Sequence, residues 1–216
     1  MRLVTEPYLM RDRKLPKVGN HILAQFDDSS IVVYQAYRPE IGKFAACQGY
    51  FGGEFSFERM SWIKPNFLWM MYRSGWGTKL GQEIVLAIWL KRSAFDDILA
   101  RAVHAKFAPE IYASEAEWKK AVQNSNVRLQ WDPDRCPSGT KLARRAIQLG
   151  LRGDVLKAYA REWIMHIEDI SEFVHQQCQN ISSDCAQLIT PRETVYPIVN
   201  LDTTIKLKLA PNPACN

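Results

Sequence analysis

The chain contains 216 residues, of which 47% are hydrophobic and 24% are charged, and this balance predicts a packed core and excludes a disordered composition. Its formal net charge of +5 allows an anionic partner, such as a phosphate-bearing cofactor or nucleic acid, without requiring one. No apolar run approaches the ~20 residues that span a bilayer, and the first residues lack the apolar segment of a secretory signal. We therefore expect no membrane segment and a cytoplasmic or nuclear location.

The two ends of the chain differ in composition from its middle. Residues 1–20 are charged and interrupted by prolines, so we expect a loosely held N-terminal arm. Residues 21–189 alternate between strand and helix patterns and are expected to form a single domain. Residues 190–216 carry further prolines and one alternating run, Thr204–Leu209, which indicates a C-terminal edge strand or a mobile tail.

The strand patterns begin with Ile31–Tyr37, which is rich in β-branched and aromatic residues. Pro39 then starts a helix that Gly49 ends, because proline suits the first helical position and glycine suits a left-handed cap. Glu83–Leu90 is almost continuously apolar, as a buried strand should be. Later strands are expected at 127–131, which leads into a turn at 132–134, and at 143–151 and 163–168.

Capping patterns predict further helices. Ser93 precedes an amphipathic stretch that runs to about Lys106, and Ser114 with Glu117 forms a capping box for a helix at 115–123. Short helices are also expected at 155–161, on the surface, and from 171 to about 179. Because short strands alternate with short helices, the sequence predicts one α+β domain with a mixed or largely antiparallel sheet.

The stretch Glu58–Lys79 combines large rings with cations, and Pro65 and Gly75 bound a helix within it. One interpretation is a buried helix whose cations extend to water. The other is a pocket wall, in which an aromatic ring stacks on a base or nicotinamide ring while Arg and Lys bind phosphates. On the second interpretation the candidate cofactor-binding residues are Tyr34, Gln35, Arg59, Trp62, Lys64, Trp69, Tyr72, Arg73 and Ser74.

Two residues are candidates for catalysis. Arg38 directly follows a strand, where it either holds an anion or only pairs with Glu40. Glu162 lies beside Trp163, where a carboxylate either stabilises a developing positive charge or is simply a surface residue at a helix end.

The segment from Gln130 to Asp132 ends a predicted strand. Its polar side chains either point into a cleft or belong to a β-turn that uses Asp132 with Pro133.

Several other site classes are excluded by their missing motifs. The sequence has no GxSxG and no phosphate-binding GxxxxGK[ST] loop. Its cysteines are Cys47, Cys136, Cys178, Cys185 and Cys215. They are widely spaced without a CxxC pair, which predicts reduced thiols and no metal site.

Five blocks resemble a known family: VYQAYRPEI (33–41), RMSWIKPNFLWMMYRSGW (59–76), VRLQWDPDR (127–135), IQLGL (147–151) and REWIMHIEDI (161–170). Together they resemble the domain-of-unknown-function family 4291 from about residue 22 to 175. That resemblance covers most of the chain and implies no particular activity.

The order of elements is also similar to that of ADP-ribosyltransferases. In those folds a first-strand basic residue and a Tyr or Ser hold NAD, and a late Glu contacts the ribose and supports an oxocarbenium-like transition state. This resemblance implies such roles for Arg38, for Tyr72 or Ser74, and for Glu162. It departs from the family pattern, because no His-Gly or Arg-Gly follows the first strand and the bulky Trp163 follows Glu162.

Two hypotheses follow for the function. The first is an NAD-dependent ADP-ribosyltransferase that acts on nucleic acid or protein. The second is a non-catalytic module for nucleic acid or a nucleotide, in which cations meet phosphates and tryptophans stack on bases.

Overall fold

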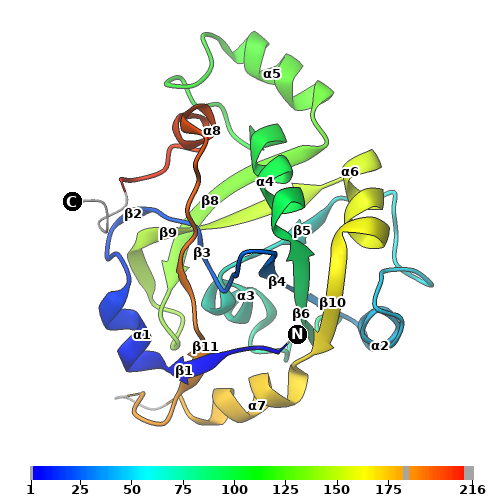
Figure 1. Cartoon of the computed structure of the whole chain (residues 1–216), viewed down its shortest axis with the longest axis vertical. Helices are drawn as coiled ribbons and strands as arrows, with labels where there is room; N and C mark the ends of the chain where they lie inside the picture. The colour runs from blue at the N-terminus through cyan, green and yellow to red at the C-terminus, as the bar shows by residue number, and fades with distance from the viewer. Residues whose placement is uncertain (1, 182–184, 212–216) are drawn as a thin grey trace.

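Two sheets carry the fold of this computed structural model, which describes residues 2–181 and 185–211. The first sheet is antiparallel, with the order β10 (Ile164–Asp169), β6 (Ile84–Lys91), β4 (Ser30–Tyr37) (Figure 1). Both faces of β4 and β6 are buried, since alternate residues of each strand belong to two different hydrophobic clusters. This double burial explains why Glu83–Leu90 is almost continuously apolar.

The second sheet is mixed and is centred on β9 (Lys141–Leu151). β9 pairs antiparallel with β8 (Val127–Arg135) and with β5 (Ser61–Ile63), and parallel with β2 (Gly19–Asn20). β7 (Val103–His104) runs parallel to β8 at the far edge. Together the two sheets confirm the predicted α+β fold with mixed, mostly antiparallel pairing.

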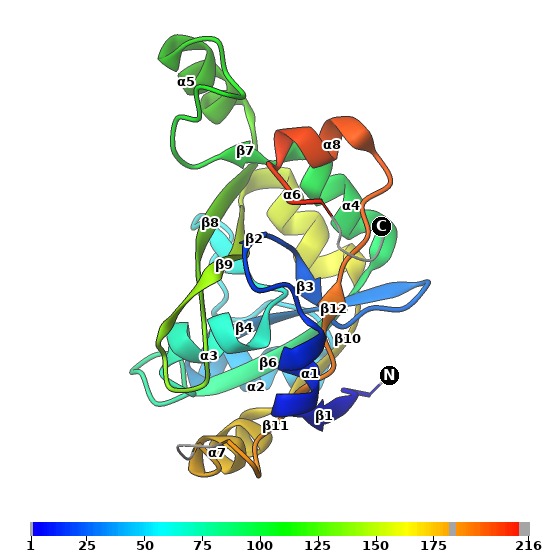
Figure 2. The same ribbon diagram turned by 90° about the vertical axis from the view of Figure 1, so that its left-hand side faces the viewer.

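The helices cover these sheets on several sides. Their bounds are α1 (Tyr8–Lys14), α2 (Pro39–Gln48), α3 (Phe67–Ser74), α4 (Arg92–Arg101), α5 (Glu115–Asn124), α6 (Gly153–Ala158), a π-helical turn (Tyr159–Trp163), α7 (Ser171–Gln179) and α8 (Leu201–Lys206). In two views at right angles α5 stands at one end of the molecule and α7 at the other (Figures 1 and 2).

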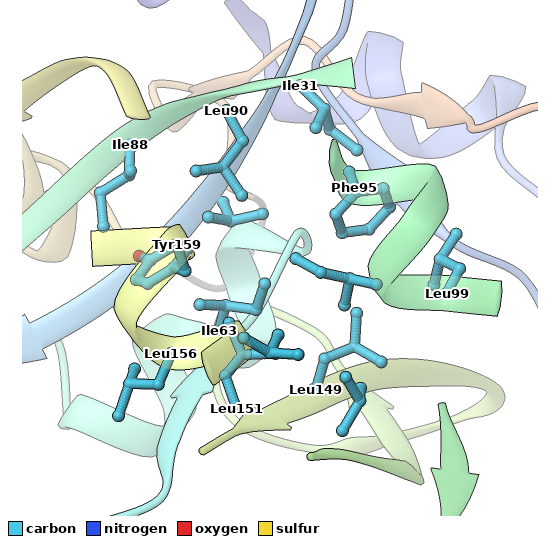
Figure 3. Packing of buried hydrophobic residues seen from close by; sticks show 14 of the residues in the cluster. Ile31, Ile63, Ile88, Leu90, Phe95, Leu99, Leu149, Leu151, Leu156 and Tyr159 are labelled. Carbon is cyan, nitrogen blue, oxygen red and sulfur yellow. The ribbon is translucent and has the colours of Figure 1, made fainter. Parts of the chain in front are cut away.

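The main core lies between the two sheets and is closed by α4 and α6. Ile88 and Leu90 from the first sheet converge with Leu149 and Leu151 from the second, and Phe95 from α4 fills the space beside them (Figure 3). All of these side chains are fully buried. Burying a large apolar side chain contributes about 1.5–3 kcal/mol, so this layer supplies much of the driving force for folding.

The predicted bounds of the helices on either side of β5 are confirmed, except that Pro65 does not open α3, because Asn66 is its N-cap and Pro65 lies outside the helix. Arg38 precedes α2 with Pro39 at its first position, and Gly49 ends it with a φ of 75°. The Asn66 side chain accepts a hydrogen bond from the Trp69 N–H at the start of α3, and Gly75 ends that helix with a φ of 58°. Glycine adopts this left-handed conformation without the steric cost that a Cβ would add.

Residues 1–20 are not a loose arm. β1 (Thr5–Pro7) pairs with β11 (Ile189–Pro191), and the α1 residue Arg11 forms a buried ion pair with Glu193. β12 (Thr194–Val195) pairs with β3 (Leu23–Ala24). The two ends of the chain are therefore joined by backbone and side-chain contacts between residues remote in sequence, which no local pattern reveals.

Two local expectations are also wrong. Residues 132–134 continue β8 and do not form a turn. Pro133 is tolerated there because β7 pairs with β8 only near Arg128 and Leu129, which leaves one side of β8 unpaired at Pro133. The alternating run Thr204–Leu209 is not a strand, since its first half completes α8.

The helix expected at 155–161 forms as α6 and the π-helical turn, but its inner side chains are buried in the main core. α4 begins directly at the end of β6 at Arg92, without a side-chain cap from Ser93, and it ends at Arg101.

Candidate functional site

A cleft of about 950 Å³ is lined by residues of both sheets and of α3. The strand residues Gln35, Trp62, Gln130, Asp132 and Gln148 contribute polar and aromatic side chains. Around them stand Arg38, Glu54, Arg59, Lys64, Trp69 and Arg73. The volume falls within the range of about 300–1,000 Å³ typical of small-molecule sites.

Strand alternation turns Gln130, Asp132 and Gln148 away from the main core. Their neighbours Leu129 and Leu149 belong to that core, and successive side chains of a strand point to opposite faces. α3 lies beside the β8–β9 hairpin (Figure 2) and contributes Trp69 and Arg73 to the cleft. The cleft is thus bounded by α3 and by the face of the second sheet that is turned away from the core.

β5 connects the two sheets next to the cleft. It pairs with the end of β9, and the backbone N–H and C=O groups of Lys64 bond those of Tyr34 on β4 at 3.2 and 2.7 Å. Trp62 lies opposite Gly150 in this pairing, and a Cβ at Gly150 would stand 3.0 Å from the Trp62 ring. The missing side chain therefore leaves room for the indole against the sheet.

Lys64 is a buried cation without a carboxylate partner among the described residues, and only 6% of it is exposed. Its Nζ donates to the Trp62 carbonyl at 3.2 Å. The pKa of this amine is lowered to about 7, chiefly by burial and also by the nearby Arg73, while Asp132 opposes the shift.

Asp132 is held by carboxamides from two strands. The Gln130 Nε2 donates to its two oxygens at 2.9 and 3.2 Å, and the Gln148 Nε2 donates to Oδ2 at 2.8 Å. Gln130 and Gln148 are direct cross-strand partners. The carboxylate is therefore fixed in place by the pairing of β8 with β9.

A hydrogen-bond network behind the cleft fixes Gln35. Its Nε2 donates to the Ser61 Oγ at 2.8 Å and to the Trp62 carbonyl at 3.2 Å, while its Oε1 accepts from the Tyr159 hydroxyl at 2.6 Å. The Tyr37 and Ser61 hydroxyls are 2.7 Å apart. Burial raises the pKa of both Tyr37 and Tyr159, so these phenols keep their protons.

Arginines form the exposed side of the cleft. Arg38 binds Glu54 at 2.5 Å and lies 3.7 Å from Glu40. Arg59 and Arg73 are exposed and have no ion pair with any carboxylate of the described residues. Two guanidinium groups are thus free to bind an anion.

A stack of side chains extends from the cleft along α3. The rings of Trp69 and Tyr72 are 5.5 Å apart and nearly parallel, and the Arg135 guanidinium lies 3.8 Å from the centre of the Tyr72 ring. Arg135 comes from the end of β8, so the stack also attaches α3 to the second sheet. Trp69 is buried, whereas Tyr72 is 38% exposed.

Comparison with known families gives one match, to a family described as a domain of unknown function (DUF4291), over residues 21–196. The chain belongs to the DUF4291 family. A search of curated proteins found no match. The matched region contains every cleft-lining residue of this DUF4291 domain.

The cleft brings together most of the residues that the sequence singled out. Seven of them line it: Gln35, Arg38, Arg59, Trp62, Lys64, Trp69 and Arg73. They come from β4, β5 and α3 and from the segments that connect these elements. Because they follow one another in the chain, one stretch of sequence supplies most of a wall.

Four predicted residues lie outside the lining. The Tyr34 side chain is buried beneath α3 against Phe67, on the face of β4 opposite to Gln35. The Ser74 hydroxyl donates to the Met70 carbonyl at 3.0 Å inside α3. Tyr72 stands outside in the stack, and Glu162 is exposed on the π-helical turn. For Tyr34 and Ser74 the ligand-binding prediction is corrected to a role in packing and in the helix end.

The second sheet contributes the residues that sequence reasoning weighed least. Gln130 and Asp132 line the cleft, which agrees with the interpretation that their side chains point into one. Gln148 also lines it and was not predicted from the sequence. Polar residues at alternate positions of a strand were the available signal. The cross-strand pairing that gathers them is visible only in three dimensions.

No group of three or more His, Cys, Asp or Glu side chains suited to a metal ion occurs among the residues that the structure describes. In that same part of the chain no helix combines the length and apolar character needed to cross a bilayer.

Proposed function

We propose that this DUF4291 protein is an NAD-binding ADP-ribosyltransferase-like enzyme with its active site in the cleft. The observation that carries the proposal is the position of Asp132. A carboxylate fixed by two carboxamides lies in a cleft that also presents tryptophan rings and two arginines, Arg59 and Arg73, without an ion pair to a described carboxylate. Such a set can bind phosphates, stack on rings and stabilise a positive charge.

The residues of the cleft fit the parts of NAD. Arg59 and Arg73 would bind the two phosphates, because exposed guanidinium groups without carboxylate partners suit bidentate phosphate binding. Trp62 would stack on one of the rings, and Gln35, whose amide is held by Ser61, Trp62 and Tyr159, would form part of the wall of the cleft. When bound, NAD supplies a ribose carbon that carries a good leaving group.

Asp132 would stabilise the positive charge that develops on the ribose as the bond to nicotinamide breaks. Its two oxygens are already oriented by Gln130 and Gln148, so little reorganisation is needed when the charge appears. The sequence resemblance gave this role to Glu162, which is exposed on the π-helical turn and does not line the cleft. The proposal therefore moves the role to Asp132.

The experiment compares Asp132→Asn with Glu162→Gln, two nearly isosteric changes. Calorimetry with NAD up to millimolar concentration and chromatography of released nicotinamide measure binding and turnover. We expect Asp132→Asn to lower turnover by at least about 100-fold, in the range seen on removal of one group that stabilises a transition state. The exposed α8 residue provides a matched control, Asp202→Asn, which should keep the wild-type rate.

Two outcomes would contradict the proposal. The absence of NAD binding to the wild-type chain at millimolar ligand would end it. A loss of turnover with Glu162→Gln but not with Asp132→Asn would return the catalytic role to the residue that the sequence resemblance indicated.

A second candidate is a non-catalytic nucleic-acid module, which the Trp69–Tyr72–Arg135 stack favours. Exposed Tyr72 could stack on a base outside the cleft, and the neighbouring Arg73, which lines the cleft, could bind a phosphate. This function predicts that the logarithm of the binding constant for a single strand falls by about 0.7 per phosphate contacted as the logarithm of salt concentration rises. Tyr72→Ala should weaken such binding, and affinity independent of salt would exclude it.

A further inference from the structure

Transfer to a hydroxyl acceptor needs a group that removes its proton, and few residues of the cleft can do so. Arg38, Arg59 and Arg73 line it, and arginine stays protonated in proteins. Tyr37 also lines it, and burial raises its pKa, so its hydroxyl keeps its proton. Neither His nor Cys occurs among the described residues of the lining.

The two carboxylates of the lining are already engaged. Both oxygens of Asp132 accept hydrogen bonds from Gln130 and Gln148, which weakens a carboxylate as a base. Glu54 is salt-bridged to Arg38 at 2.5 Å, and both side chains are about half exposed. The remaining titratable group of the described lining is Lys64.

The surroundings of Lys64 suit a proton acceptor. Its backbone is fixed on both sides, by the bonds to Tyr34 and by its place directly after β5. Among the described residues its Nζ donates one hydrogen bond, to the Trp62 carbonyl at 3.2 Å, and forms no ion pair with a carboxylate. The Trp62 carbonyl also accepts from Gln35 at 3.2 Å, so this contact is shared and leaves the amine available to a ligand.

We propose that Lys64 is the general base that takes the proton from a hydroxyl acceptor in this cleft, so that the acceptors are hydroxyl compounds, water included. This rests on the ADP-ribosyl transfer proposed above. In the step, the acceptor O–H proton passes to the lone pair of the Lys64 Nζ. The acceptor oxygen bonds to the ribose carbon, and the electron pair of the broken carbon–nitrogen bond leaves with nicotinamide.

The surroundings of Lys64 on α3, β5 and β8 set the pH at which its amine loses its proton. Arg73 on α3 and burial at the end of β5 favour the neutral amine, whereas Asp132 on β8 favours the ammonium. Arg38, Arg59 and Glu54 are the other charged side chains of the described lining, and all three are exposed. With a pKa of about 7, Lys64 is protonated and inactive at lower pH and becomes a base at higher pH. The turnover rate should therefore rise with pH through about 7.

The first test needs no turnover. Lysine labelled with ¹³C is followed by NMR from pH 5 to pH 11, and the Lys64 signal is identified by its loss in Lys64→Arg. We expect a midpoint near 7 for Lys64, against the ordinary value of 10.5. A midpoint above about 9 would overturn the proposal, because the amine would then be an ammonium at neutral pH.

The second test measures NAD binding and nicotinamide release for Lys64→Arg and Lys64→Gln, with Lys120→Arg on α5 as the matched control. We expect both Lys64 variants to lose at least about 100-fold in rate while the affinity for NAD changes only a few-fold. The wild-type rate should rise with pH through about 7. This pH profile tests the role of Lys64 even if both variants fail to fold.

The outcomes separate the two proposals. If the protein consumes NAD at a rate that does not depend on pH, and the Lys64→Arg variant stays active, the role of Lys64 as general base is overturned. The proposed transferase activity is unaffected by that result. A wild-type chain that does not bind NAD would overturn both.

Discussion

Two buried cations close to Tyr34 have opposite environments. Arg11 is 1% exposed and forms an ion pair with Glu193, whereas Lys64 is 6% exposed and has no ion pair with a described carboxylate. Glu193 also accepts from the Phe67 N–H at 2.6 Å, at the start of α3. The first cation joins both ends of the chain to α3, and the second faces a cleft.

The comparison of Arg11 with Lys64 shows how a counter-charge changes the role of a buried cation. A buried cation with a partner holds elements together and is costly to disturb. A buried cation without one destabilises the fold and gives up its proton easily, which is the condition for a catalytic amine. The three variants below probe this difference.

The largest effect should come from Glu193→Ala. It would leave Arg11 buried without a counter-charge and remove the acceptor of the Phe67 N–H. We expect a loss of about 3–5 kcal/mol in the free energy of unfolding, measured by urea denaturation. The double variant Arg11→Met with Glu193→Leu should recover most of that loss. A single variant as stable as the wild type would contradict the proposed role of the pair.

We expect Lys64→Met, in contrast, to increase the free energy of unfolding. The folded-state pKa of about 7 lies below the ordinary 10.5, so below pH 7 the folded state bears the full cost of a buried ammonium. Between pH 7 and 10.5 the unfolded state binds more protons, and stability rises with pH. At about 1.4 kcal/mol per pKa unit the ceiling is about 5 kcal/mol.

Relaxation of the folded protein around the ammonium lowers that cost, so we expect Lys64→Met to stabilise the fold by about 2–4 kcal/mol at pH 6 and by much less at pH 10. Thermal unfolding at the two pH values measures the difference. A variant less stable than the wild type at pH 6 would show that the ammonium is satisfied in the folded protein.

The smallest effect should come from Glu54→Ala at the edge of the cleft. Glu54 binds Arg38 at 2.5 Å, but the side chains are 58% and 47% exposed. Exposed pairs contribute about 0–1 kcal/mol, so the free energy of unfolding should change by no more than that. Because Arg38 is released, the affinity for a phosphate ligand should rise. A loss as large as that of Glu193→Ala would remove the distinction between buried and exposed pairs.

Much of the wall formed by β4, β5 and α3 could be predicted because its signals are local. Pro39 and Gly49 bound α2 and Gly75 ends α3 as predicted, whereas α3 begins after the cap Asn66 and not at the predicted Pro65. Cap and turn residues act through the backbone of their own segment, so sequence alone indicates them. The grouping of tryptophans and cations between Glu58 and Lys79 likewise pointed to the cleft, where Trp62, Lys64, Trp69 and Arg73 now lie.

The partners of those residues could not be predicted in the same way. Arg11 and Glu193 are 182 positions apart, and Gln148 reaches Asp132 only because β8 and β9 pair in one register. Glu162 looked suitable beside Trp163, yet the π-helical turn leaves it exposed. Thr204–Leu209 alternates like a strand, but no free sheet edge receives it and α8 forms instead among the described residues.

The sequence by itself determined the α+β class, the DUF4291 family blocks and the helix boundaries around the cleft, since each depends on side chains near in the chain. The tertiary structure decided that Asp132, rather than Glu162, stands with the arginines, and that Lys64 is buried without an ion pair to any carboxylate of the described residues. Burial, register and charge pairing arise only when distant segments meet, and these properties set the chemistry of the cleft.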